Sequence, residues 1–79
     1  MSVRMDGDIV FLEGRCTAED AETLLCTLQD HPGSAVDLSG VRRMHMAVVQ
    51  IVLALAPTLR GVPADPFLAR NIFPQIDLL

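Results

Sequence analysis

The sequence predicts a small α/β domain, with an N-terminal hairpin plus a βαβ unit that form a mixed sheet packed by helices. The chain of 79 residues has room for a single domain, 1–79, and not for separate cofactor and substrate domains. Apolar residues make up 51% of the chain and charged residues only 20%, which is typical of a packed fold rather than of a disordered chain. Short β-type segments also alternate with helical patterns, as they do in a βαβ unit.

The N-terminal segments predict the hairpin. Residues 3–5 and 9–13 are short apolar runs on either side of Asp6-Gly7-Asp8. An Asp-Gly pair between two such runs is a strong hairpin signal, so we expect two adjacent antiparallel strands.

The next segment predicts an amphipathic helix. It is expected to begin at Ala18, because Thr17 and Asp20 have the spacing of a capping box. His31-Pro32-Gly33 is expected to end it. The apolar positions recur at helical spacing and predict one stripe that faces a core: Ala21, Leu24, Leu25 and Leu28.

A short strand and a second helix follow. Residues 35–38 predict a strand that pairs in parallel with residues 9–13, because a helix separates the two segments. Residues 45–59 predict a helix that is apolar on almost every side, with only Gln50 clearly polar. We expect such a helix to be covered on more than one side, in part by another molecule.

The C-terminal residues predict less regular structure. Residues 61–66 contain too much proline for a central strand and are expected to form a linker or an edge. Asp65 can cap a short helix that starts at Pro66 and ends before Pro74. Residues 75–79 match no element.

The charge of the chain argues against a nucleic-acid partner. Six arginines, no lysine and ten acidic residues give a net charge of −4, whereas nucleic-acid binding normally needs a basic face. Residues 1–40 contain eight acids and two arginines, and residues 41–79 contain two acids and four arginines. Such an uneven distribution suits the orientation of a dimer or of a protein partner, or it reflects the solvated faces of two different helices.

Targeting signals and cysteine spacing favour a reduced, cytoplasmic protein. No secretory signal pattern is present at the N-terminus. The charge-free run 44–59 is shorter than the ~20 apolar residues that cross a bilayer, so no membrane insertion is expected. The predicted helix separates Cys16 and Cys26 by roughly 13–15 Å, too far for a disulfide. No metal is expected, because no two of the candidate ligands Cys16, Cys26, His31 and His45 have a zinc-like spacing. No cofactor is expected either, because the sequence has no Gly-rich phosphate loop.

Most of the chain resembles the STAS domain of anti-sigma-factor antagonists and sulfate transporters. The matching segments are Ile9–Arg15, Val36–Val41 and the apolar helix Val49–Leu55, and residues 65–79 look like a shortened STAS C-terminus. Val49–Leu55 is also similar to STAS variants of bacterial chemosensory clusters. The resemblance implies a STAS-like fold and a signalling role in bacterial regulation.

The chain departs from the family at two places. In phosphorylation-controlled members, the second helix starts with Asp-Ser-Ser/Thr-Gly, and here His45, Met46, Ala47 and Val48 occupy those positions. Both hydroxyls are absent, so the serine phosphorylation switch of the family is not carried over. The family also has a further strand where this chain has only residues 59–65. A reduced sheet is therefore expected, with an uncovered edge or helix that pairs with another chain.

These observations predict a non-catalytic protein–protein interaction module. We expect it to bind an anti-sigma factor or another regulatory protein through the turn and the start of the second helix. The residues expected to bind the partner are Ser39, Gly40, Arg42, Arg43, Met44, His45, Met46, Ala47 and Val48.

Several alternatives stay open from the sequence. The chain is alternatively a homodimeric accessory subunit of a transporter or chemosensory complex, or a phosphotransfer protein that acts through His45. Arg42 and Arg43 suit an acidic or phosphorylated partner, or they pair with Asp37 or Glu13. Cys26 is expected to fill the core. Cys16, near a helix N-terminus that lowers thiol pKa, is alternatively a reactive thiol.

Overall fold

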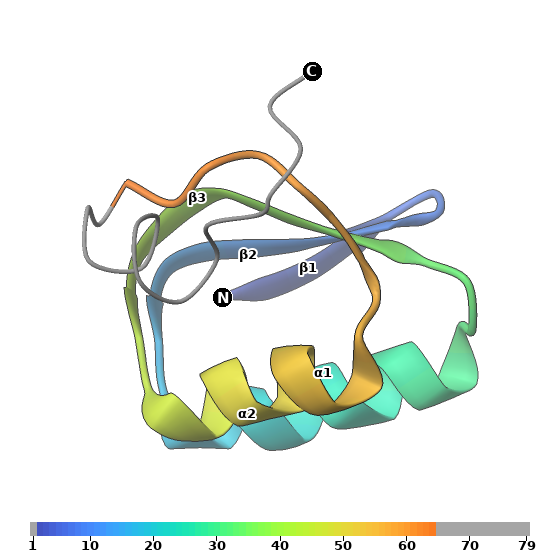
Figure 1. Ribbon diagram of the computed structural model, residues 1–79, viewed down its shortest axis with the longest axis horizontal. Helices are drawn as coiled ribbons and strands as arrows, with labels where there is room; N and C mark the ends of the chain where they lie inside the picture. The colour runs from blue at the N-terminus through green and yellow to red at the C-terminus, as the bar shows by residue number, and fades with distance from the viewer. Residues whose placement is uncertain (1, 65–79) are drawn as a thin grey trace.

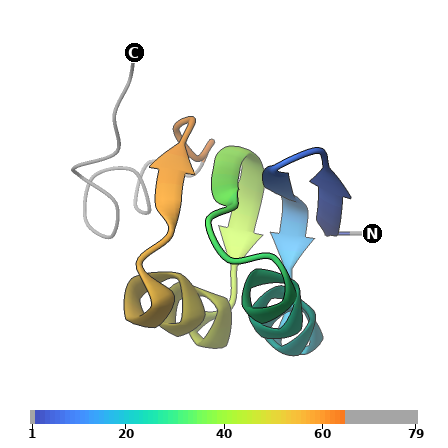
Figure 2. The same ribbon diagram turned by 90° about the vertical axis from the view of Figure 1, so that its right-hand side faces the viewer.

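The computed structural model describes residues 2–64 and confirms the predicted α/β class. The elements along the chain are β1 (Val3–Asp6), β2 (Ile9–Cys16), α1 (Ala18–Asp30), β3 (Ala35–Met44), α2 (Met46–Leu55) and β4 (Thr58–Arg60). The strands form one mixed sheet in the order β1-β2-β3-β4 (Figure 1). Figure 2 shows both helices side by side under the same face of this sheet.

The first two strands form the predicted hairpin. β1 and β2 pair antiparallel, with Val3 opposite Leu12 and Asp6 opposite Ile9. Gly7 lies in the turn at φ +61°, a left-handed conformation that glycine adopts without steric cost. β2 then pairs in parallel with β3 across α1, as the predicted βαβ unit requires.

Helix α1 has the start that its local signals predict. The Asp20 carboxylate accepts hydrogen bonds from the Thr17 backbone N–H (2.7 Å) and hydroxyl (3.2 Å), which ties down the first turn at Ala18. Within the predicted stripe, Ala21, Leu24 and Leu28 are buried and Leu25 is half-buried. Cys26 lies on the outer face of the helix and is exposed, so its predicted place in the core is wrong.

Strand β3 is much longer than the predicted residues 35–38. It continues to Met44 because β2 also continues, and the two strands remain paired up to Cys16 opposite Met44. Two irregularities in the register, at Phe11/Glu13 and Gly14/Arg15, accompany this pairing, and such irregularities bend a strand without ending it. Figure 1 shows β2 and β3 curving together toward the starts of the helices.

Helix α2 is shorter than predicted, and a strand takes the place of its expected end. The helix ends at Leu55, and Ala56 adopts the left-handed conformation (φ 47°, ψ 50°). Pro57 explains this end, because proline disfavours helical geometry in the residue before it. Thr58–Arg60 then pair in parallel with β3. The described sheet therefore has a fourth strand, although a reduced sheet was expected.

The core lies between the two helices and one face of the sheet. The sheet contributes Val10, Leu12, Val36 and Leu38, each fully buried. From α2, the residues that face this core are Val48, Val49 and Val52. The opposite side of α2 is open in residues 2–64, with Met46 and Leu53 each 56% exposed. The expected covering of α2 on more than one side is thus not found in this part of the chain.

The described chain ends beside the sheet. Pro63 is buried, and the Ala64 N–H donates to the Val41 carbonyl at 2.9 Å. The predicted cap at Asp65 and the predicted helix of residues 66–73 lie outside the described residues.

Candidate functional site

The residues expected to bind a partner are close together in the chain and span the second half of β3 and the start of α2. Ser39–Met44 belong to the second half of β3, His45 precedes α2, and Met46 and Ala47 begin the helix. The expected turn is therefore the end of a strand. We use the name β3–α2 surface for Ser39, Gly40, Arg42, Arg43, Met44, His45, Met46 and Ala47. Val48 is fully buried against the core, so it supports this surface from below.

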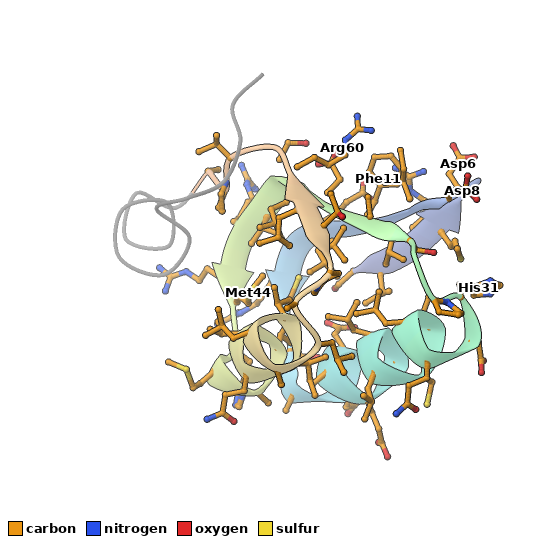
Figure 3. The ribbon with its side chains drawn as sticks, turned by 45° about the vertical axis from the view of Figure 1, so that its right-hand side comes forward. Asp6, Asp8, Phe11, His31, Met44 and Arg60 are labelled. Atoms are coloured by element: carbon orange, nitrogen blue, oxygen red, sulfur yellow. The ribbon has the colours of Figure 1, made fainter. Side chains whose placement is uncertain are left out.

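Exposure differs along the β3–α2 surface. The side chains of Arg42, Arg43, His45 and Met46 are exposed, whereas Met44 and Ala47 are half-buried against the core cluster. In Figure 3, the acidic hairpin end with Asp6 and Asp8 lies away from Met44. The surface therefore presents cationic, imidazole and thioether groups together.

His45 holds the start of α2 in place. Its backbone N–H donates to the Cys16 carbonyl at 2.8 Å, and its Nδ1 accepts from the Ala47 N–H at 3.0 Å. This contact makes the His45 side chain the N-cap of α2.

The arginines of the surface have none of the ion-pair partners proposed for them. Asp37 pairs with Arg60 (2.9 Å) and Glu13 pairs with Arg4 (3.0 Å). The predicted pairing of Arg42 and Arg43 with these two carboxylates is therefore wrong. Within residues 2–64, three arginines have no carboxylate within 4.0 Å: Arg15, Arg42 and Arg43.

The Asp37 side chain has a structural role in β3. Burial by itself would raise the pKa of Asp37, but hydrogen bonds from the Ser39 hydroxyl (2.6 Å) and N–H (2.8 Å), together with Arg60, hold the pKa below its usual value. Figure 3 shows Arg60 on the sheet face opposite the helices. Because the Ser39 hydroxyl already donates to Asp37, it is a structural group in this arrangement.

Sequence reasoning missed Arg15, which the fold brings beside the surface. Arg15 lies opposite Arg43 in the parallel register. An open hollow of about 310 Å³ lies between these strand ends, lined by Arg15, Cys16, Thr17, Arg43, Met44 and His45. The predicted parallel pairing could have placed Arg15 beside Arg43, since the carboxyl ends of parallel strands meet at one edge of a sheet.

Cys16 in this hollow is not the activated thiol that its position suggested. It is 2% exposed, and burial, with a smaller effect from Asp20, raises the pKa of its thiol to about 11. A thiol with that pKa is almost entirely protonated near neutral pH, and the protonated form is a poor nucleophile. The expected lowering of its pKa is wrong because the chain buries the side chain.

The described part of the chain offers neither a metal site nor a membrane-spanning helix. Within residues 2–64, no three His, Cys, Asp or Glu side chains gather as a metal site requires. Over the same residues, no helix combines the length and apolar character needed to cross a membrane.

Comparisons with models of protein families, with curated proteins and with solved structures found no match. The likeness to STAS domains therefore rests on the residues quoted above.

Proposed function

We propose that the protein is a non-catalytic interaction module that binds a regulatory protein through the β3–α2 surface. The observation that carries this proposal is the group of exposed arginines without ion-pair partners in residues 2–64, next to the exposed Met46. Guanidinium groups suit carboxylates and phosphates, and methionine adapts to apolar surfaces of different shapes. The partner therefore presents an acidic patch beside an apolar one.

The partner class follows from the resemblance to STAS domains, which supports an anti-sigma factor or another regulatory protein. Met46 and Ala47 supply no hydroxyl at the positions where the family is phosphorylated. Binding is then constitutive, set by the concentration of the partner or by competition. The hydrogen bond at His45 Nδ1 supports a structural role for this residue rather than phosphoryl transfer.

Paired variants of the full chain test the proposed surface. Immobilised wild type, Arg43→Glu and the control Gln29→Glu are used to capture partners from the native host. Gln29 is exposed on α1, away from the β3–α2 surface. A protein captured by wild type and control is then purified and titrated. We expect Arg43→Glu to weaken its binding at least about tenfold and Gln29→Glu less than about twofold. Equal affinities for all three proteins would remove the proposal.

Phosphoryl transfer is tested separately. The full chain is incubated with acetyl phosphate, a small phosphoryl donor, and examined by phosphorus NMR and mass spectrometry. We expect no phosphorylated residue in Ser39–Val48. Phosphohistidine at His45 that disappears in His45→Ala would contradict the non-catalytic assignment.

A further inference from the structure

A second surface lies between the two helices, on the side away from the sheet. α1 and α2 run side by side (Figure 2), and the groove between them has a volume of about 450 Å³. We call it the helix groove. Its lining is mostly apolar and includes Ala21, Glu22, Leu25, Ala47, Ile51 and Ala54.

The groove continues into the uncovered side of α2. Met46, Gln50 and Leu53 follow one another at helical spacing, so they form a ridge along the outside of the helix. Met46 and Leu53 are each 56% exposed and Ala54 is also exposed. Large apolar side chains that gather at a groove mark a site where another molecule binds.

The charge of the two helices indicates which kind of molecule binds in the helix groove. Residues 18–30 contain four acids and no basic residue, and residues 46–55 contain no charged residue. Glu22 lines the groove, and Glu19 lies three residues before it on the same helix face. An occupant with cationic side chains beside an apolar stripe complements this surface, whereas a second copy would bring its own Glu19 and Glu22 toward the same two carboxylates.

The groove has the length of a short helical contact. Its lining spans residues 18–25 of α1 and 47–54 of α2, and seven steps of ~1.5 Å give roughly 10 Å, about two helical turns. A helix in such a groove anchors apolar side chains at i, i+3 or i+4, and i+7. We propose that the helix groove binds a basic amphipathic helix of a partner protein.

The test uses a labelled synthetic peptide and the full chain. The probe is a 14-residue helix with leucines at i, i+3, i+4 and i+7 spacing and lysines at the other positions, and its matched control has glutamates in place of the lysines. Fluorescence anisotropy measures binding at low and high salt. We expect the lysine peptide to bind at least about tenfold more tightly than the glutamate peptide, and the difference to shrink at high salt.

Three variants test whether the peptide binds in the helix groove. Ala54→Arg fills the groove with a cation and is expected to weaken binding at least about tenfold. Glu22→Gln removes one carboxylate and should weaken it about two- to fivefold. Asp30→Asn, at the far end of α1, is the charge-matched control and should change it less than about twofold. Circular dichroism checks that each variant is folded, and NMR methyl shifts should change at Ala21, Ile51 and Ala54.

Four results would overturn the proposal. The first is equal binding of the two peptides, and the second is unchanged binding by Ala54→Arg. The third is a dimer of the wild type in light scattering that Ala54→Arg makes monomeric, which would assign the groove to a second copy. The fourth is a set of nuclear Overhauser contacts from Ala54 to residues 65–79, which would assign it to the chain's own end. Arg43→Glu should leave peptide binding intact, which separates this site from the β3–α2 surface.

Discussion

The two halves of β3 belong to one strand but have different surroundings. In the first half, Ala35–Asp37 pair with both β2 and β4, and the Asp37 carboxylate forms an ion pair with Arg60. Ser39–Met44 extend past the end of β4 and keep β2 as their paired strand in the described residues. The first half stabilises the sheet, whereas the second half carries exposed arginines. Beyond the end of β4, Arg42 and Arg43 are therefore accessible, while Val41 beside them stays buried in the core.

The largest expected effect separates the two halves by stability. Leu38 is fully buried, so Leu38→Ala leaves a cavity and should lower the free energy of unfolding by about 2–5 kcal/mol. Arg42→Ala, in the exposed half, should change it by less than about 0.5 kcal/mol. Urea unfolding followed by circular dichroism measures both, since the chain has no Trp or Tyr for fluorescence. Similar losses of unfolding free energy in the two variants would contradict the proposed difference between the two halves of β3.

The next effect concerns the close approach of the chain after β4. Gly61 has φ +78°, and a Cβ there would lie 2.8 Å from the Ser39 backbone nitrogen. Gly61→Ala should cost about 2–3 kcal/mol, since strain and overlap add. Gly40→Ala is the control, because Gly40 has no left-handed φ and its Cβ would meet Glu13 Cγ at 3.2 Å, a looser contact than at Gly61. We expect a change within about 1 kcal/mol for the control, and a tolerated Gly61→Ala would contradict the observed packing.

The Asp37–Arg60 ion pair in the first half of β3 makes the stability of the fold depend on pH. The pKa of Asp37 is held below its usual 3.8, so the folded state releases this proton more readily than the unfolded state does. The stability it provides is full above pH 3.8 and is lost as the pH falls through the lower folded value. At pH 7, Asp37→Asn should cost about 1–2 kcal/mol, since it removes charged hydrogen bonds.

Measuring the free energy of unfolding at decreasing pH tests whether the ionised Asp37 carboxylate stabilises the fold. The difference in unfolding free energy between wild type and Asp37→Asn should be constant above about pH 5 and shrink below pH 3.8. A difference that grows on acidification would show that the carboxylate is not stabilised in the fold.

The smallest effect is a gain in stability at the turn that leads into β4. Ala56 adopts φ 47°, a left-handed conformation that glycine adopts more easily. Ala56→Gly should therefore raise the free energy of unfolding by about 0.5–1 kcal/mol. The same urea experiment measures it, and a loss of stability would mean that the turn is relaxed with alanine.

The sequence predicted which residues form the β3–α2 surface, but not which ion pairs and neighbouring residues the fold gives them. The residues from Arg42 to Met46 were expected in the turn and at the start of the second helix; His45 and Met46 lie at the helix start, whereas Arg42–Met44 form the end of β3. Their ion partners were predicted wrongly, because the pairing of Asp37 depends on Arg60 in a strand that the apolar pattern had assigned to a helix. Arg15 was missed because only the parallel register brings it opposite Arg43.

Local signals determined the hairpin around Gly7 and the start of α1 at Ala18, because turn and cap preferences act over a few neighbouring residues. Tertiary structure decided the rest. Ser39-Gly40 has the composition of a turn, yet pairing with β2 carries the strand through it. Thr58 and Leu59 fell within the predicted helix, and pairing with Ala35–Asp37 makes Thr58–Arg60 a strand. Strand pairing joins residues that are distant in sequence, so no local pattern contains it.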